Sequence, residues 1–113
     1  MHEMSLCEGV LQVLEEHSRS QGFDRVTAVF LEIGGLSGVE PEAMRFCFDA
    51  VTRGTLAERA ALEIEHVPGQ AWCMQCATTV QVNQRFDQCP DCDSYQLQVT
   101  GGDEMRIREL EVE

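Results

Sequence analysis

Four of the six cysteines form two matched pairs. Each pair is separated by two residues, and twelve residues lie between the pairs, which are Cys73 with Cys76 and Cys89 with Cys92. A turn of this length can present two thiolates to one metal ion, and two such turns complete a tetrahedron. The spacing therefore predicts a closed four-cysteine metal site. Such an ion stabilises the fold and has no open coordination position for catalysis.

The spacing leaves the identity of the ion open. Zinc suits four thiolates best, although iron in a rubredoxin-like centre uses the same donors. A redox-active dithiol is a third interpretation, but that chemistry needs one pair at a helix start and not two facing pairs. Neither pair is followed by glycine, because Ala77 and Asp93 occupy those positions. We therefore expect backbone strain at Ala77.

A second candidate metal site lies at the start of the chain, where His2 follows Met1. The terminal amine of Met1 and the amide and imidazole of His2 can form fused chelate rings around one ion. The amide of Glu3 can add a fourth nitrogen in the same plane. Planar nitrogen donors suit Ni(II) or Cu(II) and serve Zn(II) poorly. A histidine at position two is more often accidental, so these residues alone support only a hypothesis.

The composition excludes several classes of partner. Twenty carboxylates against eight arginines and no lysine give a formal charge of −12, which disfavours nucleic acid. We find neither an apolar run of membrane-spanning length nor a signal peptide, so we expect no membrane partner and a cytoplasmic location. In that reducing compartment the cysteines should not form disulfides. Cys7 and Cys47 fall on apolar helix faces, where we expect them to fill the core.

Hydrophobic periodicity predicts an α+β fold. Two helices should pack with a small three-stranded antiparallel sheet, and a four-cysteine zinc-ribbon-like subdomain should be inserted before the last strand. The predicted elements are a helix from Met4 to about Arg19, a strand over Val26–Ile33, a helix starting at Glu40-Pro41, a strand within "ALEIEHV", and a final strand within "MRIRELEVE". This order divides the chain into an α+β domain, residues 1–68 and 103–113, and a metal-binding domain, residues 69–102.

Several motifs together resemble the HypA/HybF family of hydrogenase nickel-incorporation proteins. They cover essentially the whole chain and occur in the order expected for that family. The motifs are the N-terminal "MHEMSLC", the central "RVTAVFLEIGGLSGVEPEAMRFCFD", "RGTLAE", the pairs "WCMQC" and "QCPDC", and the closing "IRELEVE".

The resemblance implies a metallochaperone and not an enzyme. Such a protein delivers nickel to the large subunit of [NiFe]-hydrogenase, works with the HypB GTPase, and allows a homodimer. Nickel, the transient cargo, would bind through Met1, His2 and Glu3, and Glu40 lies where relatives place an acidic side chain. The structural zinc of the family maps to Cys73, Cys76, Cys89 and Cys92.

Two functions from other classes remain as alternatives. A zinc-ribbon adaptor would use the cysteine quartet for protein contact alone, and His2 would then have no role. A rubredoxin-like electron carrier would hold iron and would be red when purified. The residues show no set with the spacing of a hydrolase or transferase site.

Overall fold

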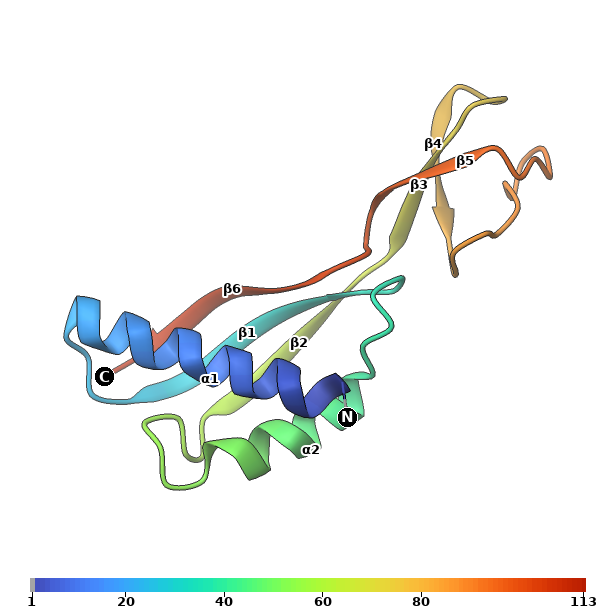
Figure 1. The fold of residues 1–113 in the computed structure, drawn as a ribbon. Helices are drawn as coiled ribbons and strands as arrows, with labels where there is room; N and C mark the ends of the chain where they lie inside the picture. The colour runs from blue at the N-terminus through green and yellow to red at the C-terminus, as the bar shows by residue number, and fades with distance from the viewer. Residues whose placement is uncertain (1) are drawn as a thin grey trace. The chain divides into compact units, whose positions relative to one another are not determined.

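The computed structural model describes residues 2–113 (Figure 1). The chain forms two compact units. The second unit consists of Glu32–Gly38 and His66–Met105, and the other described residues form the first. The elements, in chain order, are α1 His2–Gln21, β1 Val26–Gly34, α2 Pro41–Thr52, β2 Ala61–Val67, β3 Gly69–Cys73, β4 Thr78–Val82, β5 Leu97–Gly101 and β6 Met105–Val112.

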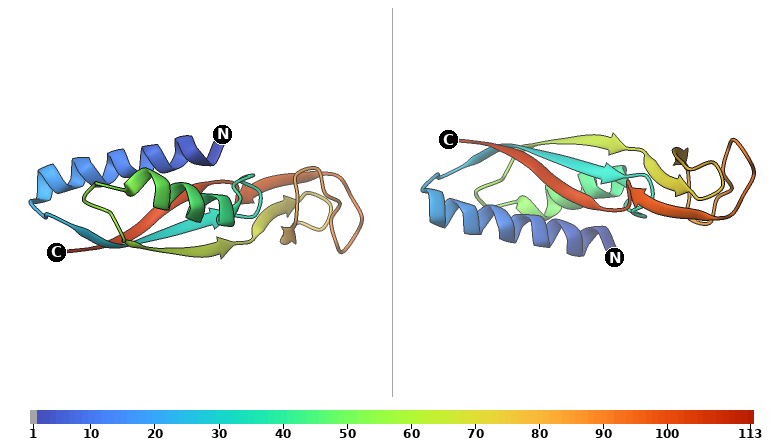
Figure 2. Two further views of the ribbon diagram at one scale, coloured as in Figure 1. Left: turned by 90° about the horizontal axis from the view of Figure 1, so that it is seen from below. Right: turned by 90° about the horizontal axis from the view of Figure 1, so that it is seen from above.

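The two helices pack on one face of a three-stranded sheet whose order is β2-β1-β6 (Figures 1 and 2). Both are amphipathic and bury one stripe each, which is the usual way that a surface helix contributes to a core. Buried residues of α1 are Cys7, Val10 and Leu14, and those of α2 are Met44, Cys47, Phe48 and Thr52. His17, near the end of α1, is exposed. The α+β class is confirmed.

Strand β1 is central in this sheet, which explains why its sequence is apolar at almost every position. The predicted antiparallel relation holds between β1 and β6. Gly34 N–H donates to the Glu104 carbonyl over 2.9 Å, and Glu113 N–H donates to the Arg25 carbonyl over 2.9 Å. Strands β1 and β2, which α2 connects, point the same way in Figures 1 and 2.

Local signals set the helix ends. Gly22 follows α1 with φ of 80° and donates its N–H to the Ser18 carbonyl, a common way to end a helix. Glu40 caps α2 because its carboxylate accepts the Glu42 N–H over 3.1 Å, and Pro41 occupies the first helical position. The predicted start of the second helix is therefore confirmed.

The second unit contains three strands that the sequence pattern did not reveal. They form an antiparallel sheet of order β4-β3-β5, in which Ala71 lies opposite Val80 on one side and Val99 on the other. Leu36, far away in the sequence, completes its core. The buried core residues are Leu36, Ala71, Cys73, Val80, Val82 and Cys89. The functional assignment of the two predicted domains stays a prediction.

Among the helices in residues 2–113, none has both the length and the apolar character needed to cross a bilayer.

Candidate metal centres

The first cysteine pair lies on a tight turn that leaves the end of β3. Cys76 N–H donates to the Cys73 sulfur over 3.3 Å, and Ala77 N–H donates to the Cys73 carbonyl over 2.8 Å. Ala77 has φ of 54°, the left-handed conformation that the sequence predicted there. This conformation costs an L-residue roughly 1–2 kcal/mol. The turn therefore contains a strained residue, and the Cys73 and Cys76 thiols lie close to each other.

The second pair repeats this geometry. Asp91 N–H donates to the Cys89 sulfur over 3.4 Å, and Asp93 N–H donates to the Cys89 carbonyl over 2.9 Å. Asp93 has φ of 63°, which an aspartate tolerates better than an alanine does. Two separate segments thus form similar turns, and in each a backbone N–H donates to the first sulfur and stabilises negative charge on it.

The four sulfurs converge on one point. Cys73 Sγ lies 3.6 Å from Cys92 Sγ, Cys76 Sγ lies 3.9 Å from Cys89 Sγ, and all four lie within 4.8 Å of one another. A tetrahedron with zinc–sulfur bonds of about 2.3 Å has sulfur–sulfur edges of about 3.8 Å. The quartet therefore fits a tetrahedral ion, and among residues 2–113 it is the only converging group of three or more such ligands.

The protonation of the quartet also favours a cation. The Cys76 N–H, which donates to the Cys73 sulfur, lowers the pKa of Cys73 to about 7. The neighbouring Cys92 thiol, followed by burial, raises the pKa of the Cys76 thiol to about 12. The Cys76 thiol therefore holds its proton at neutral pH. A divalent metal that binds the sulfurs displaces such thiol protons and compensates the negative charge of the thiolates.

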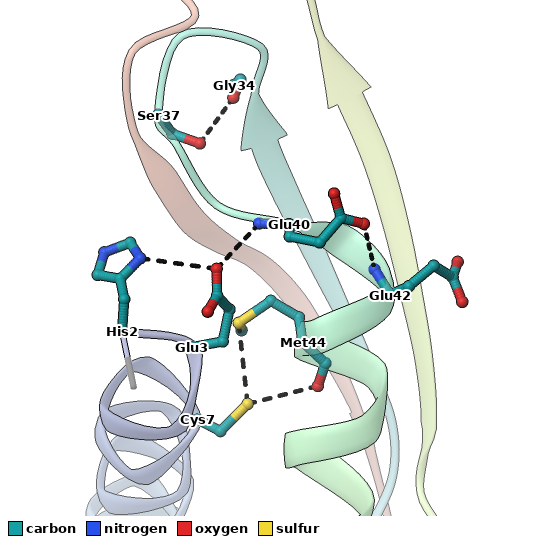
Figure 3. Close-up of polar contacts among 8 residues, drawn as sticks. All are labelled: His2, Glu3, Cys7, Gly34, Ser37, Glu40, Glu42 and Met44. Carbon is teal, nitrogen blue, oxygen red and sulfur yellow. Dashed lines mark hydrogen bonds and ion pairs between the residues drawn. The ribbon is translucent and has the colours of Figure 1, made fainter.

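At the start of α1, the side chains of His2 and Glu3 point toward each other (Figure 3). His2 Nδ1 lies 3.7 Å from Glu3 Oε2, and 57% of the His2 side chain is exposed. The same Glu3 oxygen accepts the Glu40 N–H over 3.2 Å, and this hydrogen bond is the main reason that the pKa of Glu3 is lowered. Glu3 therefore links the start of α1 to the segment that precedes α2.

The amides of His2 and Glu3 are the first two in α1. The first four N–H groups of an α-helix have no acceptor within the helix. Binding of a metal by these two nitrogens would therefore break no helical hydrogen bond. Met1, whose terminal amine belongs to the predicted ligand set, lies outside the described residues.

Glu40 contacts the start of α1 with its backbone N–H and not with its carboxylate. Its N–H contacts Glu3, whereas its own Oε1 accepts the Glu42 N–H and caps α2 (Figure 3). As a nickel ligand, the Glu40 carboxylate would have to leave the helix cap. The sequence motif contained both the cap and the acidic position, but the direction of the side chain could not be predicted from it.

Cys7 and Cys47 are core residues, as predicted, with exposed fractions of 0% and 1%. The Cys7 sulfur lies 3.5 Å from the Met44 carbonyl and 3.8 Å from the Met44 sulfur. Burial raises the pKa of Cys7 to about 11, so this thiol stays neutral. Both cysteines pack between the helices and belong to neither candidate metal site.

Comparison with known proteins decides the family. The family model described as "Hydrogenase/urease nickel incorporation, metallochaperone, hypA" matches residues 1–112. The chain belongs to the HypA family. Proteins named hydrogenase maturation factor HypA from Albidiferax ferrireducens and Azotobacter chroococcum are 66% and 61% identical to it, and each alignment covers 100% of both chains.

Two solved structures share the fold of this HypA-family chain. The solution structure of the Ni metallochaperone HypA from Helicobacter pylori has a TM-score of 0.69 and 23% identity, covering 97% of this chain and 96% of that one. A second solution structure, of HypA protein, has a TM-score of 0.72 and 25% identity, covering 99% and 96%. The family resemblance and the fold class inferred from the sequence are both confirmed.

Proposed function

We propose that this chain carries Ni(II) and delivers it to the large subunit of [NiFe]-hydrogenase during maturation. The observation that carries the proposal is the match of the nickel-incorporation family to residues 1–112. Full-length relatives named hydrogenase maturation factor support it. The work of such a protein is to bind and release an ion, so we assign it no catalytic residue.

The nickel ligands in this proposal are the terminal amine of Met1, the amide and imidazole of His2, and the amide of Glu3. The exposure of His2 and the position of both amides at the start of α1 support this set. His2 Nδ1 closes a six-membered ring with its own amide nitrogen, and that atom now faces Glu3 Oε2. Nickel would therefore replace the contact between His2 Nδ1 and Glu3 Oε2. Glu40 could join only after leaving the cap of α2.

A site at an exposed chain end suits a carrier better than a buried cage does. Release then requires movement of few residues, and a partner can reach the ion directly. Amine, amides and imidazole all lose protons on binding, so acidification should weaken the site. Glu3, held by the Glu40 N–H, keeps the first turn of α1 beside α2 while the ion enters and leaves.

The cysteine quartet, in this proposal, holds a structural Zn(II). The sulfur spacing fits that ion, and the four cysteines would occupy all four coordination positions of the zinc. Thiolates of this kind persist in the reducing cytoplasm, where we place the protein. We further propose that the HypB GTPase and a second copy of the chain are partners, in keeping with the family.

The test needs protein with its native, untagged amino terminus. Equilibrium dialysis should show one Ni(II) per chain in the wild type and none in His2→Ala. His17→Ala is the matched control, because His17 is an exposed histidine of the same helix. Elemental analysis should show one zinc in every variant. Unchanged nickel binding in His2→Ala would refute the ligand assignment, and a wild-type chain that binds no nickel would favour the adaptor alternative.

A further inference from the structure

The second unit has a pocket of about 120 Å³ on the core side of its sheet. An engineered apolar cavity of about 150 Å³ holds one benzene molecule, so this pocket has room for one ring or one branched aliphatic side chain. Its floor is apolar and comes from all three strands, namely Ala71, Val82, Leu97 and Val99. The other lining residues form the rim, and they are Gln84, Arg85, Phe86, Asp87 and Tyr95.

The two aromatic rim residues are exposed. Phe86 has an exposed fraction of 93% and Tyr95 one of 71%, although large apolar side chains are normally buried. Phe86 also has φ of 65°, so its backbone is in a conformation that bulky residues rarely adopt. Packing within residues 2–113 does not explain why an aromatic side chain stands at either position. Both side chains line the pocket and are free to contact a group that enters it.

The rim carries one carboxylate, Asp87, which already accepts the Asn83 N–H over 3.2 Å, and one cation, Arg85. It is the only arginine in the second unit, in a chain without lysine and with a net charge of −12. Within residues 2–113 its guanidinium has no ion-pair or hydrogen-bond partner. An arginine fork matches the geometry of a carboxylate. A cation beside an apolar pocket therefore selects a ligand with an apolar group next to a carboxylate.

We propose that this pocket binds a segment of a partner protein in which a bulky apolar side chain is adjacent to an acidic residue. Arginine and tyrosine are enriched among the residues that dominate protein–protein binding energies, and both stand on this rim. The apolar side chain would occupy the floor, and the carboxylate would contact Arg85. This proposal does not depend on the nickel ligands, which lie in the first unit.

The test uses the intact zinc-loaded protein and methyl NMR of Val82, Leu97 and Val99. The probe is a blocked tripeptide with phenylalanine between two glutamates, and it should shift these methyl signals at about 1 mM. Replacing its phenylalanine by alanine, or its glutamates by lysines, should weaken binding about tenfold. Arg85→Gln and Phe86→Ala should each do the same.

The matched control is Arg19→Gln, which removes the same charge from an exposed arginine of α1 and should bind like the wild type. Zinc content checks that each variant is folded. Equal binding of the acidic and basic tripeptides, or no shift at about 10 mM, would overturn the proposal. Equally tight binding of N-acetylphenylalanine would show a small-molecule site instead. Shifts that follow protein concentration without peptide would identify a second copy as the occupant.

Discussion

Two adjacent glycines should respond very differently to the same substitution. At Gly102, φ is 73°, and an added Cβ would lie 2.7 Å from Gly69 Cα and would overlap the Pro68 carbonyl oxygen. At Gly101, an added Cβ would meet only the Gln70 side chain, at 3.7 Å or more. The neighbours of Gly102 are backbone atoms, which cannot rotate away. We therefore expect Gly102→Ala to destabilise the second unit and Gly101→Ala to be tolerated.

The difference between the two variants can be worked out. The left-handed backbone should cost an alanine at Gly102 about 1–2 kcal/mol, and the overlap should cost about 1–3 kcal/mol more. The loss of freedom in the unfolded chain is the same for both variants and cancels in the comparison. Gly102→Ala should therefore have a free energy of unfolding about 2–5 kcal/mol below that of Gly101→Ala. This is a large part of the stability of a small domain, which is about 5–15 kcal/mol.

Trp72 supplies the assay, because it is the only tryptophan and lies in β3 of the second unit. Urea unfolding at a fixed excess of zinc, followed by its fluorescence, should show the difference. Nickel stoichiometry at the N-terminus should be the same for both variants, since the proposed ligands belong to the first unit. A difference below about 1 kcal/mol would refute the argument that backbone atoms exclude a side chain at Gly102.

Three further predictions concern the two candidate metal centres and the core between the helices. The pKa of the Glu3 carboxyl, followed by carbon NMR, should lie below the ordinary value for glutamate, because the Glu40 N–H favours its charged form. A depressed pKa in the folded state adds stability above the unfolded value of about 4.3, and this stability is lost as the pH falls through the folded pKa. Glu40→Ala should lower the free energy of unfolding by about 1 kcal/mol, because α2 loses its cap, and a thermal melt without a shift would contradict this. A strong chelator should make the four paired cysteines react with iodoacetamide, whereas Cys7 and Cys47 should stay unmodified in mass spectra, since both are buried.

The sequence by itself determined the local features of this protein. Gly22 and the Glu40-Pro41 pair determine where α1 ends and α2 begins, because caps and turns depend on residues a few positions apart. The cysteine spacing determines two similar turns for the same reason. Family membership was also readable, since the motifs span the whole chain.

Only the tertiary structure decided how distant segments meet. The short strands β3, β4 and β5 depend on pairing across the insert, and Leu36 joins their core from more than thirty residues away, which no local pattern encodes. The same holds for the Glu40 carboxylate, which caps α2 while its backbone holds Glu3, and for the pocket beside Arg85. Side-chain direction and pocket shape follow from packing between segments, whereas periodicity and spacing report only on neighbours along the chain.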